Sequence, residues 1–237
     1  MQKTAIIIPC YNEEKRIEKK NIDYIINNTH ATIFFANDGS KDNTLSILND
    51  ISGHYNERCF VMNYEKNEGK ANTIFKAIKT INQRNEFDFI GYFDADFSTP
   101  PNEIKRLIEI VNNSDYQFVF GSRVLLLNSG IERKWYRHII GRVIITSVNF
   151  KLKLGIYDTQ CGAKIFSKEI IKVAFVEPFK TSWLFDMEIF ARLKKENCLN
   201  KGMEIPIYDW KDVEGSKLGF KTSFKIIKEL YFLLKNY

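Results

Sequence analysis

In the first part of the chain, short apolar runs alternate with longer segments of helical pattern, and this alternation constrains the fold more than any other feature. Short apolar runs are typical of buried strands, whereas apolar residues three and four positions apart are typical of helices. Strands that alternate with helices predict an α/β fold with a mostly parallel central sheet flanked by helices. The predicted strands are 4–9, 32–36, 59–64 and 87–93, and the predicted helices are 13–27, 42–51 and 70–82.

Beyond residue 100 the alternation is less regular. Helices are predicted at 101–112, 135–148 and 185–195, and strands at 118–121, 162–166 and 205–210. No linker marks a second domain, so we expect one large domain over residues 1–218. An amphipathic C-terminal helix, 219–237, then either belongs to this domain or forms an appendage at a membrane surface. No apolar run approaches the roughly 18 residues that a membrane span needs, and the N-terminus does not have the pattern of a signal peptide.

Four cysteines lie far apart, which favours reduced cytosolic thiols over a zinc site or a disulfide framework. The net charge of +6 is concentrated near residues 132–155 and 217–237. Such local basicity favours an anionic or phosphate-bearing partner and gives no reason to expect nucleic-acid binding.

Polar clusters follow each of the first four predicted strands. They occupy residues 10–14, 37–40, 66–70 and 94–96. In open sheets of this kind, ligands bind beyond the carboxyl ends of the strands. The four clusters therefore predict one site at one edge of the sheet.

Asp94 and Asp96 come directly after an apolar strand. Two carboxylates that leave a strand together can reach one hard cation, and such oxygen-rich sites suit Mg²⁺ or Mn²⁺ completed by substrate phosphates. The alternative for this short motif is a solvated turn or a helix cap. The glycine patterns of a P-loop and of a dinucleotide-binding turn are both absent, which argues against a nicotinamide dehydrogenase.

Taken together, the motifs resemble family 2 glycosyltransferases of the GT-A fold, and most closely the branch that transfers sugars to polyprenyl phosphates, which includes the dolichyl-phosphate β-glucosyltransferases. The similarity covers residues 4 to about 220, and the motifs occur in the order IIIPCYNEE (6–14), NDGSKDNT (37–44), NEGKANTIFKAI (67–78), YFDADFSTPP (92–101), GSR (121–123), DTQCGAKIF (158–166) and WLFDMEIF (183–190). Two departures are present. Asn37 stands where the family usually has an aspartate, and Ser98 stands where the mannosyl branch often has a glutamine.

The resemblance implies a role for each matching residue. It places Asp94 and Asp96 at the metal and at the donor's ribose-diphosphate, with Asp96 among the catalytic residues. The other donor-binding residues that it implies are Pro9, Tyr11 and Glu13 at the nucleotide, Asp38 at the base, Lys70 near the nucleotide, Arg123 facing phosphate, and Lys217 near the diphosphate on a closing segment.

The acceptor determines whether the reaction needs a general base. A sugar hydroxyl needs one, whereas a lipid monophosphate is already an anion. Asp186 is the expected base if one is required, and Asp158 is expected to organise the metal or acceptor loop, with a cap or a salt bridge as the alternative. Arg133, Arg137 and Arg142 are the expected contacts to an acceptor phosphate.

Two amphipathic segments carry apolar residues on one side and basic residues on the other, around residues 134–145 and at the C-terminus. Such segments are typical of an anionic bilayer interface. The alternative is that each apolar stripe packs on the core.

These observations predict an inverting transfer of a hexose, glucose in the first instance, from a UDP-sugar to a polyprenyl phosphate at the cytoplasmic face of a membrane. The alternatives are transfer to a glycan hydroxyl, GDP-mannose as donor, a nonenzymatic nucleotide-sugar sensor or basic adaptor, and a nucleotidyltransferase. The sequence leaves the oligomeric state open.

Overall fold

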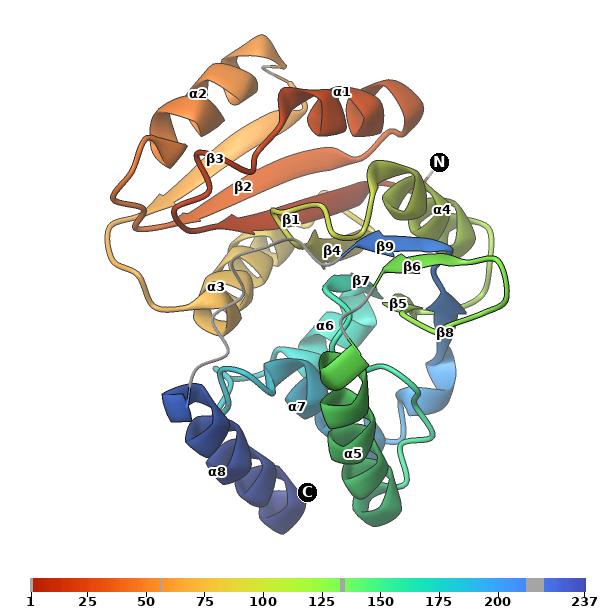
Figure 1. Ribbon diagram of the computed structural model, residues 1–237. Helices are drawn as coiled ribbons and strands as arrows, with labels where there is room; N and C mark the ends of the chain where they lie inside the picture. Colours follow the sequence, from red (N-terminus) through yellow and green to blue (C-terminus); the bar gives the residue numbers. More distant parts are fainter. Residues whose placement is uncertain (1, 56, 133–134, 212–219) are drawn as a thin grey trace.

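A seven-stranded sheet runs through the centre of the molecule in the computed structural model, which describes residues 2–55, 57–132, 135–211 and 220–237 (Figure 1). The strand order is β3-β2-β1-β4-β7-β5-β8, and a separate two-stranded sheet pairs β6 with β9. The strands are β1 (Thr4–Cys10), β2 (Thr32–Asp38), β3 (Cys59–Tyr64), β4 (Phe89–Phe93), β5 (Phe118–Ser122), β6 (Gly130–Glu132), β7 (Ala163–Ser167), β8 (Gly202–Pro206) and β9 (Asp209–Lys211).

The predicted parallel sheet is confirmed for the first four strands, because β1 pairs in parallel with both β2 and β4, and β2 with β3. β7 is antiparallel to its neighbours β4 and β5, and β8 is parallel to β5. The carboxyl ends of β1 to β5 and β8 therefore share one edge with the amino end of β7. This reversal of β7 brings the segment that precedes it, residues 158–162, to the edge where the four polar clusters lie.

Helices cover both faces of the sheet (Figure 1). Side chains of β1 alternate between the faces, so that Ile6 and Ile8 join one core cluster and Ala5 and Ile7 join the other. The first cluster contains residues of α1 (Lys19–Asn28), α2 (Thr44–His54) and α4 (Pro101–Asn112). The second contains residues of α3 (Lys70–Gln83), α5 (Trp135–Leu152), α6 (Lys168–Ala174), α7 (Phe185–Lys195) and α8 (Phe220–Asn236), and a short 3₁₀ helix, η1, spans Leu199–Lys201.

The C-terminal helix α8 is attached to this second cluster. Leu233 is fully buried, and Glu229 accepts four hydrogen bonds from the turn before α7. The donors are the backbone N–H groups of Ser182, Trp183 and Leu184 and the hydroxyl of Ser182, at 2.9–3.0 Å.

Two predicted elements differ most from those observed, and β6, α6 and η1 were not predicted. The first helix begins at Lys19, six residues later than expected, because the backbone N–H and the carboxylate of Glu13 are engaged by Thr44 and Arg16. The last predicted strand, 205–210, is divided between β8 and β9, since the chain leaves the large sheet after Pro206 and β9 pairs with β6. Within the described ranges, no helix combines the length and the apolar character needed to cross a bilayer.

Candidate active site

A cavity of about 260 Å³ opens at the carboxyl edge of β1, β2 and β4. The sequence predicts nine residues at the donor or the metal. Seven of them line this one cavity, and the other two, Arg123 and Lys217, come later in the chain. The lining consists of Pro9, Cys10, Tyr11, Glu13, Asp38, Lys70, Thr73, Asp94, Ala95 and Asp96. The convergence of polar strand ends that the sequence predicts is therefore present.

Asp94 lines this cavity and contacts both a lysine and a glycine. Its carboxylate pairs with the ammonium of Lys70, the first residue of α3, and its backbone N–H donates to the carbonyl of Gly162 at 3.1 Å. The carboxylate lies directly against Gly162, where an added Cβ would come within 1.9 Å of Asp94 Oδ2. Burial opposes the charge of Lys70, but Asp94, Asp186 and Asp96 outweigh it and raise its pKa.

Asp96 is a destabilised carboxylate. Burial and the neighbouring charge of Asp94 raise its pKa, and the hydrogen bond from the backbone N–H of Ser98 at 3.0 Å opposes this shift only in part. Burial also raises the pKa of Glu13, against its ion pair with Arg16 at 2.6 Å, and Asp96 and Asp94 add to that rise. The cavity therefore holds excess negative charge, which a cation would relieve.

The donor set at Asp94 and Asp96 fits Mg²⁺ or Mn²⁺, because it offers only carboxylate oxygens beside an open cavity. Among the described residues, no group of three or more His, Cys, Asp or Glu side chains is arranged to hold a metal. Mg²⁺ sites of this kind commonly use one or two carboxylates together with water and substrate phosphates.

Asp38 fastens the loop that leads into α3. Its two carboxylate oxygens accept from the backbone N–H groups of Glu68 and Gly69, both at 2.9 Å. Gly39 next to it has a φ of +64°, and a Cβ there would meet the backbone N of Asn67 at 2.7 Å. This turn therefore requires glycine at residue 39. The predicted contact of Asp38 with the base of the nucleotide stays a prediction.

Arg123 and Asp158 form a buried bidentate ion pair beside the cavity. Arg123 Nε lies 2.6 Å from Asp158 Oδ2, and Arg123 Nη2 lies 2.9 Å from Asp158 Oδ1. The Cζ atom of the guanidinium lies 5.1 Å from the ring centre of Trp210. Burial would lower the pKa of Arg123, but the carboxylate of Asp158 raises it strongly. Of the roles weighed for Asp158, a salt bridge is observed, and the contact of Arg123 with phosphate stays a prediction.

Asp186 lies in the first turn of α7 and is also ion-paired. Its Oδ1 accepts from Lys164 Nζ at 2.7 Å and from the hydroxyl of Tyr92. No described residue donates a hydrogen bond to Oδ2.

Sequence reasoning missed Lys164 and Gly162. A single lysine inside the apolar strand 162–166 was the available signal, because a buried charge requires a partner.

The three predicted acceptor arginines are less fully described. Arg142 donates to the carbonyl of Tyr157 at 2.9 Å and lies 3.9 Å over its ring, so it supports the loop before Asp158. Arg133 and Lys217 lie outside the described residues, and the side chain of Arg137 does too.

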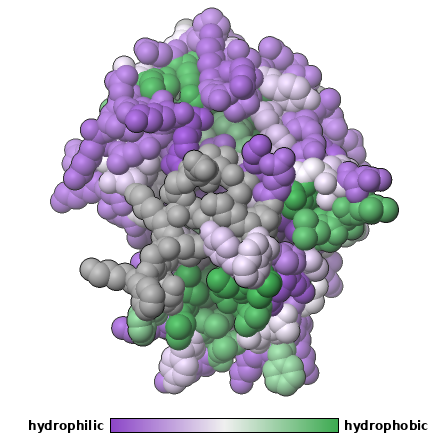
Figure 2. Space-filling view, viewed as in Figure 1, coloured by the Kyte–Doolittle hydropathy of each residue, from purple (hydrophilic) through white to green (hydrophobic). Residues whose placement is uncertain are grey.

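The apolar stripe at the start of α5 does not pack on the core. Its exposed residues are Trp135, Tyr136, Ile139, Ile140 and Val143, whereas Ile145 and Val148 further along the helix are buried. On α8, Phe224, Ile227 and Tyr231 are similarly exposed, beside Lys225 and Lys228. Figure 2 shows hydrophobic surface over α5 and beside α8, and a second group at the loop between β5 and β6, where Leu127 is 94% exposed.

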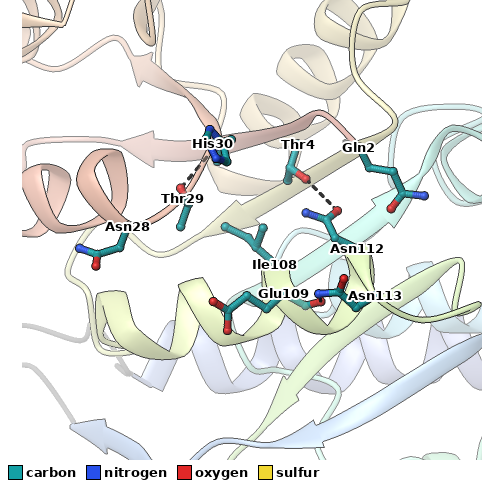
Figure 3. A pocket seen from close by; sticks show the side chains of 10 residues that line it. Gln2, Thr4, Asn28, Thr29, His30, Ile108, Glu109, Asn112 and Asn113 are labelled. Carbon is teal, nitrogen blue, oxygen red and sulfur yellow. Dashed lines mark hydrogen bonds between the residues drawn. The ribbon is translucent and has the colours of Figure 1, made fainter.

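A larger cavity of about 360 Å³ lies at the opposite, amino-terminal edge of the sheet, between α1 and α4 (Figure 3). Its polar side chains include Asn28, His30, Glu109 and Asn112, and Thr4 donates to Asn112 across it at 3.5 Å. It contains none of the strand-end motifs, so the smaller cavity is the candidate active site.

The sheet order and the aspartate pair beyond β4 define a GT-A fold. The chain belongs to glycosyl transferase family 2, whose family model matches residues 5–175. The solved structure of glucosyl-3-phosphoglycerate synthase from Mycobacterium tuberculosis in complex with UDP has the same fold, with a TM-score of 0.73 and 15% identity over 99% of this chain and 80% of that one. A second complex of that enzyme, with Mn²⁺, UDP and glucosyl-3-phosphoglycerate, has a TM-score of 0.71 and 14% identity over 98% and 78% of the two chains.

The sequence relatives include enzymes that act on dolichyl phosphate. A dolichyl-phosphate beta-glucosyltransferase of Trichomonas vaginalis is 30% identical over 95% of this chain and 71% of its own length. The human dolichyl-phosphate beta-glucosyltransferase is 27% identical over 98% of this chain and 75% of its own length. The predicted resemblance to this branch of the family is confirmed.

Proposed function

We propose that this protein transfers glucose, or a closely related hexose, from a UDP-sugar to a polyprenyl or dolichyl phosphate, with inversion at the anomeric carbon. The family and the names of the relatives support the reaction class. The UDP and Mn²⁺ bound in the two complexes of glucosyl-3-phosphoglycerate synthase support the donor and the cation.

The observation that carries the proposal is the cavity in which Asp94 and Asp96 meet Lys70. Asp94 and Asp96 would hold Mg²⁺ or Mn²⁺, which when bound neutralises charge that develops on the departing diphosphate. Lys70, at the N-terminus of α3, would donate to the diphosphate, where the helix dipole also favours an anion. Pro9, Tyr11, Glu13 and Asp38 would hold the nucleotide.

The ion pairs of the two other carboxylates favour an acceptor that needs no base. Arg123 occupies both oxygens of Asp158, and Lys164 and Tyr92 both donate to Oδ1 of Asp186. These oxygens already accept strong hydrogen bonds, so they are not free to receive the proton of an acceptor hydroxyl. A lipid monophosphate needs only positioning to attack in line, opposite the leaving diphosphate. No described residue donates a hydrogen bond to Oδ2 of Asp186. This oxygen therefore supports the alternative, in which the acceptor is a hydroxyl and Asp186 is the base.

We place the acceptor end of the site at a membrane surface. The exposed aromatic and aliphatic residues of α5 and α8, together with the lysines of α8, suit the interface of an anionic bilayer. α8, within the 219–237 segment, would contact lipid on this face while Glu229 and Leu233 attach it to the remainder of the domain. The arginines at 133, 137 and 142 would meet the acceptor phosphate, on the cytoplasmic side.

The test is an acceptor and donor screen with the purified full chain. UDP-glucose, UDP-N-acetylglucosamine and GDP-mannose are each incubated with Mn²⁺ and either dolichyl phosphate in vesicles or an oligosaccharide. Nucleotide release and product mass are measured, and NMR of the product gives the anomeric configuration. The proposal expects a β-glucosyl lipid from UDP-glucose. Turnover with the oligosaccharide alone, or with GDP-mannose alone, would contradict it.

A further inference from the structure

Lys164 is a lysine with no solvent exposure, in the middle of β7. It stands opposite Tyr92 in the register of β4 and β7. Its ammonium donates to the carbonyl of Cys161 and lies 2.7 Å from Asp186 Oδ1, between the rings of Tyr92 at 5.6 Å and Phe190 at 5.8 Å. The charge of Lys164 is therefore held inside the aromatic core, and its counterion is Asp186.

Stability alone does not explain a buried pair of this kind. Removing two charges from water is costly for each ion, and well-packed apolar replacements of buried pairs are often neutral or stabilising. A role in the active site would account for such a pair.

The pair continues into the active site as a row of alternating charges. The carboxylates of Asp94 and Asp186 both favour the charged ammonium of Lys70. The ammonium of Lys70 also lies 5.9 Å from the ring centre of Phe185, the neighbour of Asp186 on α7. Lys70 thus pairs with Asp94 and is attracted by Asp186, and Asp186 is itself paired with the buried cation Lys164.

We propose that Lys164 is a positioning residue for donor binding: by holding the carboxylate of Asp186, it leaves the ammonium of Lys70 available to the diphosphate of the donor. This inference rests on the proposed function, since it assumes that Lys70 meets the donor. Without Lys164, the buried carboxylate of Asp186 attracts Lys70, whose charge it already favours, and draws it away from the cavity.

The first variant is Lys164→Met, which keeps the length of the side chain and removes its charge. We expect KM for UDP-glucose to rise about tenfold and kcat to change by less than threefold, because the affected group binds the donor and does not react. In Lys164→Met/Asp186→Asn no carboxylate competes for Lys70, so KM is expected to return to within about threefold of the wild-type value.

Leu107→Ala is the control for a loss of stability. Leu107 is a fully buried residue of α4 in the other core cluster. This variant loses free energy of unfolding as large-to-small core substitutions do, and its KM is expected to stay unchanged. A merely structural role for Lys164 predicts instead that KM rises in both destabilised variants.

Calorimetric binding of UDP with Mn²⁺ separates this inference from the proposed function. If the wild-type protein binds no UDP, the proposed function fails. If the wild-type protein binds UDP and Lys164→Met binds it equally tightly, the inference about Lys164 is overturned and the proposed function stands. Should Lys164→Met not fold, the double variant decides, because binding tenfold weaker than wild type would overturn the inference.

Discussion

Replacing Gly162 with alanine tests whether the placement of Asp94 controls activity. A Cβ at residue 162 would lie 1.9 Å from Asp94 Oδ2 and 2.3 Å from its Cγ, whereas ordinary contacts begin at 3.4 Å. The carboxylate must therefore retreat by about 1.5 Å, and a misplacement of about 1 Å at a reacting centre can cost about 10²-fold in rate. We expect kcat/KM for UDP-glucose to fall about hundredfold in Gly162→Ala.

The fold should survive this change. The side chain of Asp94 is 33% exposed, so it can rotate toward solvent, and the loss of its pairing with the partly exposed Lys70 costs about 1 kcal/mol or less. Gly53→Ala is the matched control, because nothing lies within 4 Å of the added Cβ and alanine is the better helix former. Steady-state kinetics and urea denaturation measure both variants. Wild-type kcat/KM in Gly162→Ala would refute the placement of Asp94 as the controlling feature.

Two further predictions concern buried residues. Glu229→Ala removes the acceptor for four donors at residues 182–184. We expect the free energy of unfolding in guanidinium chloride to fall by about 2–4 kcal/mol, and an unchanged value would show that Glu229 does not hold α8. Burial raises the pKa of Cys161 to about 11, so at pH 8 its thiolate is roughly a hundredfold scarcer than that of an ordinary thiol, and iodoacetamide should leave it unlabelled in the native protein by mass spectrometry. Because the folded-state pKa is the higher one, the associated stability is present below about pH 9 and is lost as pH rises through about 11.

Local sequence information was sufficient to predict the first four strands and the residues of the site that directly follow them. Each of the first four strands and the polar cluster after it lie within a few residues of each other, so Asp38, Lys70 and Asp94 could be assigned to one edge from the alternation alone. The resemblance to family 2 then added the order of the later motifs.

The remaining residues of the site depend on contacts between segments that are distant in the sequence. The antiparallel direction of β7 places Gly162 against Asp94, and it pairs Lys164 with Asp186 on α7. A hydrophobic pattern shows neither the direction of a strand nor which buried cation meets which carboxylate. The amphipathic pattern likewise predicted apolar stripes on the segments that form α5 and α8, without showing which residues of each stripe reach the core.

The central claim is that Asp94 and Asp96 bind a divalent cation that in turn binds the nucleotide diphosphate. Isothermal titration calorimetry of UDP, with Mn²⁺ or with EDTA, tests it in the wild-type protein and in Asp94→Asn/Asp96→Asn. We expect Mn²⁺ to tighten UDP binding by at least about tenfold in the wild type and to have no effect in the double variant. Equal strengthening by Mn²⁺ in both proteins would contradict the claim.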